Sequence, residues 1–212
     1  MKLLSRFNLL KNYIYKSMEN YWFHNTSEIC ENVTVGNGTK IWHNSQVLSG
    51  ANIGKNCVIG HNCVVYGKAV LGDGVKIQSN TDVWDLVTLE DFVFVGPSVV
   101  FTNDKNPRAK YPKKGSSEYG EWIPTLVKSE ASIGANATIL CGTVIGKCAL
   151  VGAGTLVVKD VPDYALVVGV PGKVVGWVCE CGNKIQFDND LGECTVCSKK
   201  YKKDGDVVTK VS

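Results

Sequence analysis

The sequence predicts an all-β fold, a parallel β-helix built from six-residue repeats, and three observations support this prediction. An aliphatic residue or a phenylalanine recurs at every sixth position over a long stretch of the chain. The fifth residue of each repeat is small or β-branched, and glycine often follows the aliphatic residue directly. A period of six fits neither an amphipathic helix nor a single alternating strand, but it fits short strands joined by tight corners.

The first run of repeats begins at Val35 and keeps its register to Phe101. Three repeats make one 18-residue coil of a triangular prism, in which the aliphatic residue points inward and stacks on its equivalents about 4.8 Å away. The small fifth residue fits where the cross-section is narrow, and glycine supplies corner dihedral angles that a Cβ would penalise. The inward positions are Val35, Ile41, Val47, Ile53, Ile59, Val65, Leu71, Ile77, Val83, Leu89, Val95 and Phe101.

A second run resumes in shifted register, and together the runs contain eighteen repeats, or about six coils. Hexapeptide repeats as a class form left-handed helices, which depart from the usual right-handed crossover. We therefore expect a left-handed parallel β-helix over residues 26–176. The second run is Val127, Ile133, Ile139, Ile145, Val151 and Val157.

The two runs are separated by residues 102–126, which carry three prolines and no aliphatic period. We expect an extended loop projecting from the prism. Loops of this length inside a compact domain are usually functional, although a disordered insertion is the alternative.

The two ends of the chain lie outside the repeats. Residues 1–25 form an N-terminal extension in which Leu3, Phe7, Leu10, Ile14 and Met18 recur at helical spacing. This pattern predicts a helix that caps the prism, a plain upstream extension or, as a less favoured alternative, a helix on a membrane surface. Its basic residues interrupt the apolar run that a secretory signal needs. Residues 177–212 form a cysteine-containing appendage and tail.

The appendage carries Cys179 and Cys181, then Cys194 and Cys197. Four thiolates suit a closed tetrahedral zinc site, which would staple a segment too small for its own core. The first pair has one intervening residue instead of two, so a zinc-ribbon-like segment with free thiols is the alternative. The net charge of +3 gives no support for nucleic-acid binding. Nine cysteines without an export signal favour the reducing cytoplasm.

Two segments resemble a known family. Lys76–Ala109 (KIQSNTDVWDLVTLEDFVFVGPSVVFTNDKNPRA) and Val151–Gly182 (VGAGTLVVKDVPDYALVVGVPGKVVGWVCECG) look like the nucleotide-sugar N-acetyltransferases of the hexapeptide-repeat superfamily. The likeness runs from about residue 25 to the end. It is closest to the UDP-2-acetamido-3-amino-2,3-dideoxy-glucuronate and the dTDP-3-amino-3,6-dideoxyhexose N-acetyltransferases.

The resemblance implies a function and an assembly. It implies transfer of acetyl from acetyl-CoA to the amine, at C3, of a UDP- or dTDP-linked amino sugar, for polysaccharide or O-antigen biosynthesis. It also implies a homotrimer with acetyl-CoA lying along the prism between neighbouring subunits.

Counting in sixes places two vertical rows of side chains next to each other. His61 is the candidate general base, because histidine titrates near neutrality. The resemblance gives Asn80 a role in orienting the sugar amine or the thioester carbonyl. An amine with a pKa of about 8 is already partly neutral, so positioning alone can suffice. For the other asparagines we favour amide stacking along the corner. The rows are His43, His61, Ser79 and Pro97, and Asn44, Asn62, Asn80 and Ser98.

The candidate coenzyme site lies in the last coils. Gly152, Ala153 and Gly154 are small enough for pantetheine to approach the backbone, and Lys159 and Lys173 are placed to meet the phosphates of CoA. The alternative for each lysine is a solvated surface position.

The candidate sugar site lies in the loop, at Asn103, Asp104 and Arg108. Arginine binds a diphosphate or a carboxylate in bidentate fashion. Asp104 has a competing explanation, a hydrogen bond within its own loop.

Other functions remain open at this point. They are an O-acetyltransferase with His61 as the base, a 4-amino-sugar N-acetyltransferase, and a non-enzymatic scaffold. A carbonic anhydrase with three zinc-binding histidines is weaker. No two of the chain's histidines lie a few residues apart on one coil, and His24 precedes the repeat.

Overall fold

The computed structural model describes residues 16–18, 20–111 and 120–211. Four of the positions that predict an N-terminal helix lie outside these ranges, namely Leu3, Phe7, Leu10 and Ile14. The part of the chain that the model describes contains no helix long and apolar enough to cross a membrane.

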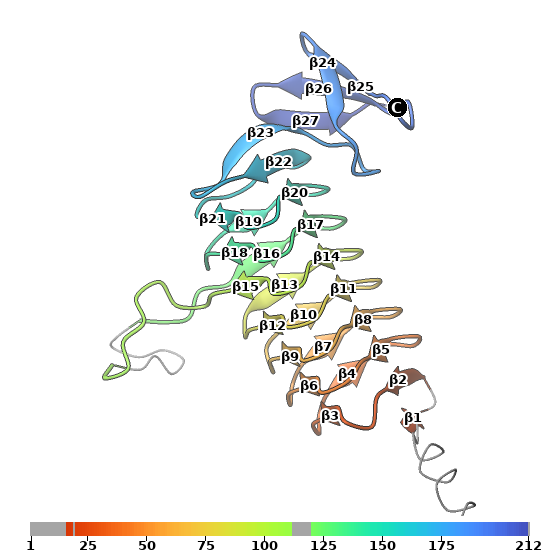
Figure 1. Cartoon of the computed structure of the whole chain (residues 1–212), viewed down its shortest axis with the longest axis vertical. Coiled ribbons are helices and arrows are strands. Elements are labelled where there is room, and N and C mark those ends of the chain that lie inside the picture. The colour runs from red at the N-terminus through yellow and green to blue at the C-terminus, as the bar shows by residue number, and fades with distance from the viewer. Residues whose placement is uncertain (1–15, 19, 112–119, 212) are drawn as a thin grey trace, which may run out of the picture.

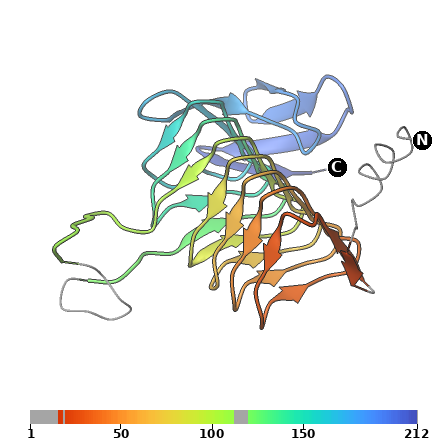
Figure 2. The ribbon, with the colours of Figure 1, turned by 60° about the horizontal axis from the view of Figure 1, so that its bottom comes forward.

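Three sheets of parallel strands form the faces of a triangular prism (Figures 1 and 2). The first face contains β2 (Tyr21–Phe23), β5 (Lys40–Ile41), β8 (Val58–Ile59), β11 (Lys76–Ile77), β14 (Phe94–Val95), β17 (Ser132–Ile133), β20 (Leu150–Val151) and β22 (Ala165–Val168). The second contains β3 (Glu28–Ile29), β6 (Gln46–Val47), β9 (Val64–Val65), β12 (Asp82–Val83), β15 (Val100–Phe101), β18 (Thr138–Ile139) and β21 (Leu156–Val157). The third contains β4 (Thr34–Val35), β7 (Asn52–Ile53), β10 (Val70–Leu71), β13 (Val87–Leu89), β16 (Thr125–Val127) and β19 (Val144–Ile145).

The faces meet at three corners, which are named here by the residues of one coil. The first corner joins the first and second faces (residues 60–63), the second joins the second and third (residues 66–69), and the third joins the third and first (residues 72–75). The solenoid is a left-handed parallel β-helix of about eight turns, which confirms the predicted fold class.

The inward positions predicted from the repeat form the core. Seventeen of the eighteen are at most 2 % exposed, and Val35, in the most N-terminal strand of its face, is half-buried. The fifth positions are buried as well. The hydroxyl of Thr39 donates to the Gly54 carbonyl at 2.8 Å, and that of Ser45 donates to the Gly60 carbonyl at 2.7 Å. These buried polar groups are thereby satisfied.

The solenoid extends further at both ends than the repeat predicted. It starts at β2, inside the predicted extension 1–25, because Phe23 and Ile29 continue the six-residue phase upstream of Val35. At the other end, β22 adds a strand to the first face after β20. The described part of the extension is a strand, β1 (Lys16–Met18), antiparallel to β2, so Met18 is not in a helix.

An extended loop interrupts the solenoid between its second and third faces. It leaves the prism after β15 and returns at β16, whose first residue, Thr125, comes one residue before the predicted loop end at residue 126. Its described part projects away from the second corner (Figures 1 and 2).

The C-terminal appendage is a small antiparallel sheet at the top of the prism (Figure 1). The strand β23 (Lys173–Trp177) turns back along β22 and leads into it. Trp177 and Tyr201 are buried where the sheet meets the last turn. The four strands are β24 (Ile185–Asp188), β25 (Leu191–Cys194), β26 (Lys200–Asp204) and β27 (Val207–Lys210).

Candidate active site along one corner of the prism

A single row of side chains runs up the first corner, from a histidine to the last coils. The residue after a row member donates its backbone N–H to the carbonyl of the row member one coil below. Asn80 donates to the His61 carbonyl at 2.9 Å, and Gly154 donates to the Ala135 carbonyl at 2.8 Å. Four coil steps of about 4.8 Å separate the ends of the row by about 19 Å. Everything above the histidine is small. The row is His61, Ser79, Pro97, Ala135 and Ala153.

The loop insertion hides the upper half of this row in the sequence. Counting in sixes from His61 reaches Ser79 and Pro97, but the chain then leaves the prism and returns in another register. Ala135 and Ala153 are brought onto the row only by the pairing of β14 with β17 and of β17 with β20. The catalytic candidate His61 and the coenzyme candidates 152–154 therefore share one corner.

The residues next to this row have left-handed backbone conformations. Asn62, Asn80 and Asn136 have φ values of 54°, 61° and 56°, and Ser98 and Gly154 adopt 57° and 67°. Asparagine tolerates this region better than most residues, which explains its recurrence at the corner. The Asn62 amide nitrogen also donates to the Asn80 amide oxygen at 3.2 Å. Asn80 thus has a structural role at the corner, which it shares with the other residues in the left-handed conformation. Its catalytic role stays a prediction.

The lower end of the first corner is an aromatic stack. The rings of His24 and His43 lie 3.5 Å apart between centroids, and those of His43 and His61 lie 4.9 Å apart with planes 5° from parallel. Trp42 stacks on His61 at 5.7 Å. The predicted repeat begins after His24, but Phe23 beside it lies eighteen residues before Ile41, and this spacing is the sequence signal that places His24 on the same corner.

The stack does not form a metal site. Rings that lie face to face direct their nitrogens side by side, and the Nδ1 of His24 is 2.9 Å from the Thr26 hydroxyl. Within the described ranges, the His, Cys, Asp or Glu groups whose ligand atoms converge are the four appendage cysteines. This geometry argues against the carbonic anhydrase alternative.

The histidine stack predicts how the stability of the folded protein depends on pH. Burial lowers the pKa of His24 below its ordinary value of 6.5, and the neighbouring rings of His43 and His61 lower it further. Below pH 6.5 the unfolded chain therefore binds more protons at this site than the folded chain does, so stability falls as the solution is acidified. We expect the denaturant midpoint to drop between pH 7 and about pH 5.

A phenylalanine at position 24 distinguishes the effect of protonating His24 from the effect of acid on the rest of the protein. His24→Phe keeps an aromatic ring and cannot be protonated, so its midpoint should vary less with pH than that of the wild type. Parallel profiles for the two proteins, measured by urea denaturation, would contradict the assignment.

The coenzyme candidates have distinct environments. A Cβ on Gly152 would lie 2.8 Å from a methyl group of Val168, so glycine is needed there for β22 to pack. Ala153 and Gly154 are exposed, and nothing lies within 4 Å of a Cβ on Gly154. Lys173 pairs with Val168 and so lies near this corner.

The remaining candidates lie at the second corner. Lys159 follows β21, on the other side of the second face from Ala153. Asn103 anchors the loop base by accepting from the Ile123 amide at 2.9 Å. Asp104 accepts from the Asn106 amide at 2.8 Å, which is the local bond expected as its competing explanation. Arg108 is exposed and donates to the Pro107 carbonyl at 2.8 Å.

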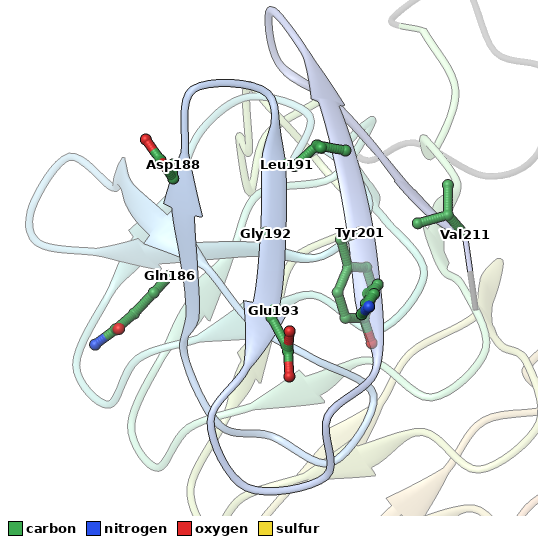
Figure 3. A pocket seen from close by; sticks show the side chains of 8 residues that line it. Gln186, Asp188, Leu191, Gly192, Glu193, Tyr201 and Val211 are labelled. Carbon is green, nitrogen blue, oxygen red and sulfur yellow. The ribbon is translucent and has the colours of Figure 1, made fainter.

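The predicted residues thus form two groups, one on either side of the second face. His61, Asn80, the 152–154 segment and Lys173 lie at the first corner, and Lys159 lies with the loop residues at the second. A pocket of about 350 Å³ lies elsewhere, on the appendage sheet (Figure 3). It contains no predicted catalytic, coenzyme or sugar residue. Its lining is Gln186, Asp188, Leu191, Gly192, Glu193, Lys200, Tyr201 and Val211.

Comparisons with known proteins agree with the repeat. The family model described as bacterial transferase hexapeptide (six repeats) matches residues 50–81, and the hexapeptide repeat of succinyl-transferase matches residues 129–159. Both segments lie in the solenoid, one on each side of the loop.

Two curated relatives share part of the chain. The dTDP-3-amino-3,6-dideoxy-alpha-D-galactopyranose 3-N-acetyltransferase of Aneurinibacillus thermoaerophilus is 49% identical over 78 residues, which is 37% of this chain and 40% of that protein. The serine acetyltransferase of Bacillus pumilus (strain SAFR-032) is 34% identical over 117 residues, 55% of this chain and 44% of that protein. The chain spans less than half the length of these relatives.

Among solved structures, an N-acyltransferase from Bacillus cereus in complex with dTDP and coenzyme A aligns with 78% of this chain and 91% of its own, at 18% identity and a TM-score of 0.49. Repeat period, strand register and matching family models lead to the same assignment. The chain contains hexapeptide repeats that match these family models over residues 50–81 and 129–159, and it has the left-handed parallel β-helix fold.

Proposed function

We propose that this protein transfers an acetyl group from acetyl-CoA to the C3 amine of a nucleotide-linked amino sugar. The observation that carries the proposal is the row of small side chains that leads from Ala153 down to Ser79 and ends at His61. Such a strip accommodates a long, narrow pantetheine arm and delivers its thioester to one defined end. The 49% identical relative, named as a 3-N-acetyltransferase of a dTDP-amino sugar, supports the choice of acceptor.

The reaction joins the amine nitrogen to the acetyl carbonyl carbon. The nitrogen lone pair attacks, the tetrahedral intermediate collapses, the C–S bond breaks, and CoA leaves as the thiolate. The amine loses one proton, which goes to the thiolate or to solvent. Because the neutral amine is already a nucleophile, positioning and stabilisation of the oxyanion do most of the catalytic work. In this scheme Asn80 orients the amine or the thioester carbonyl from its exposed place beside the row.

The binding groups follow from chemistry and placement. Gly152, Ala153 and Gly154 would receive pantetheine, and Lys173 and Lys159 would receive CoA phosphates. Asn103, Asp104 and Arg108 would bind the sugar nucleotide, with the Arg108 guanidinium suited to its diphosphate. A reducing cytoplasm suits both the nine cysteines and a thiol product.

A homotrimer is part of the proposal, because the two groups of residues lie at different corners. The described part of the loop projects outward from the prism (Figure 2). In the proposed trimer its residues would meet the first corner of a neighbouring subunit. Val100, on the face between the two corners, is 50% exposed and suits an interface. Light scattering should give three times the chain mass, and a monomeric mass for active protein would reject the shared site.

The direct test is release of CoA thiol in the presence of acetyl-CoA and a panel of UDP- and dTDP-linked 3- and 4-amino sugars. Turnover with a 3-amino sugar supports the proposal. Turnover with a 4-amino sugar alone would assign the acceptor amine to C4 instead of C3. Failure with every sugar, together with no calorimetric binding of acetyl-CoA, would leave the scaffold alternative in its place.

Replacing His61 separates N-acetylation from O-acetylation. An amine acceptor is partly neutral at pH 8, so His61→Ala should keep turnover within about tenfold of the wild type there. A hydroxyl acceptor depends on a base, and its loss typically costs about 10²–10⁴-fold. A loss in that range, measured as kcat at pH 8, would favour the O-acetyltransferase.

A further inference from the structure

Four cysteines of the appendage converge at one point. Their sulfur atoms all lie within 4.8 Å of one another, with Cys179 and Cys197 at 3.4 Å and Cys181 and Cys194 at 3.5 Å. A disulfide would need about 2.05 Å, and all four residues are free thiols in this structure. The cluster is separate from the corner and loop residues of the proposed acetyl-transfer site.

We propose that these four thiolates bind one structural zinc ion. Zinc–thiolate bonds of about 2.3 Å in tetrahedral geometry place neighbouring sulfurs about 3.8 Å apart. The observed spacing is already close to this value, so a metal needs only small side-chain movements. Four protein ligands leave no open coordination position, which makes the site structural and not catalytic.

The backbone explains how a one-residue spacing works in the first pair. The Gly182 amide donates to the Cys179 carbonyl at 2.8 Å, and the Cys179 amide donates to the Asn183 carbonyl at 2.8 Å. This tight turn, with Gly182 at a φ of 83°, folds Cys181 back beside Cys179. In the second pair, the Ser198 amide donates to the Cys194 carbonyl at 2.9 Å and closes a comparable turn.

Hydrogen-bond donors are directed at the sulfurs. The Tyr201 hydroxyl donates to the sulfur of Cys179 at 3.0 Å, and the Asn183 amide nitrogen lies 3.4 Å from the sulfur of Cys181. Donors of this kind orient and stabilise thiolate ligands around a metal. Tyr201 is fully buried, so its hydroxyl holds this position by packing.

The site connects the appendage to the end of the β-helix. Cys179 comes two residues after β23, and the Val178 amide donates to the Tyr164 carbonyl at 2.7 Å. Cys194 and Cys197 belong to the β25–β26 hairpin, and Tyr201 of that hairpin packs against Tyr164 at 5.4 Å between ring centroids. A metal here would hold the hairpin on the last turn and keep the top of the core covered.

Metal analysis of the full-length protein tests the proposal. After purification in reducing buffer without added metal, elemental analysis should find about one zinc per chain. Cys194→Ser combined with Cys197→Ser should lose it. Cys30→Ser is the matched control, because Cys30 is a free thiol at the opposite end of the prism, and it should retain zinc.

Two measurements on the wild-type protein test the proposal even if the double variant does not fold. Titration with a mercurial reagent should release zinc as the thiols react, and exchange with Co²⁺ should produce a thiolate charge-transfer band. Four freely reactive appendage thiols with no metal, iron instead of zinc, or zinc retained in the folded double variant would each overturn the proposal. None of these readouts depends on acetyl transfer, so the two proposals fail separately.

Discussion

Replacing Ala153 by tryptophan is expected to raise the KM for acetyl-CoA by about tenfold or more. Ala153 is exposed at the upper end of the small-residue row, where the pantetheine arm is proposed to lie. An indole there occupies the strip and displaces the arm, and a tenfold change corresponds to about 1.4 kcal/mol of binding free energy. The fold should persist, because the new side chain points to solvent. Steady-state kinetics with acetyl-CoA varied at a saturating amino sugar gives the measurement.

Lys55→Trp provides the matched control. Lys55 holds the same position within its repeat as Ala153, two residues after the inward residue, but it lies at the third corner, where no candidate residue was found. It is exposed and should tolerate the ring. Equal KM values for the two variants and the wild type would remove the row from the coenzyme site, even if acetyl transfer itself were established.

The second large effect concerns the core. Ile77→Ala should lower the free energy of unfolding by about 2–5 kcal/mol. Ile77 is completely buried and stacks between Ile59 and Val95 on the first face. In a solenoid each coil is stabilised by its two neighbours, so a cavity in a middle coil weakens two interfaces at once. Urea denaturation followed by circular dichroism measures the loss.

The neighbouring residue supplies the comparison. Lys76 precedes Ile77 in β11 and is exposed on the outside of the prism. Lys76→Ala should change the unfolding free energy by no more than about 0.5 kcal/mol. Similar losses for the two variants would mean that the alternation of inward and outward positions has been assigned wrongly.

The sequence by itself determined the fold, because the repeat encodes it locally. Every sixth residue must be apolar to face the axis, and this requirement is visible without knowing which coil pairs with which. Ile77 and Ile133 were therefore placed correctly in the core, and the loop bounds were within two residues at Thr125. The count failed at the N-terminal end, where Phe23 interrupts the aliphatic pattern but keeps its phase.

The tertiary structure alone decided which side chains share a corner. The loop inserts a number of residues that is not a multiple of six, so arithmetic could not continue the His61 row to Ala135 and Ala153, and only strand pairing did so. The same holds for His24, which joins the stack through the register of β2 with β5. The cysteines of the appendage converge through turns and a hairpin whose hydrogen bonds no repeat describes. The repeat can be recognised in the sequence because it depends only on the spacing of residues along the chain. The contacts that form a site depend on how distant segments are brought into register.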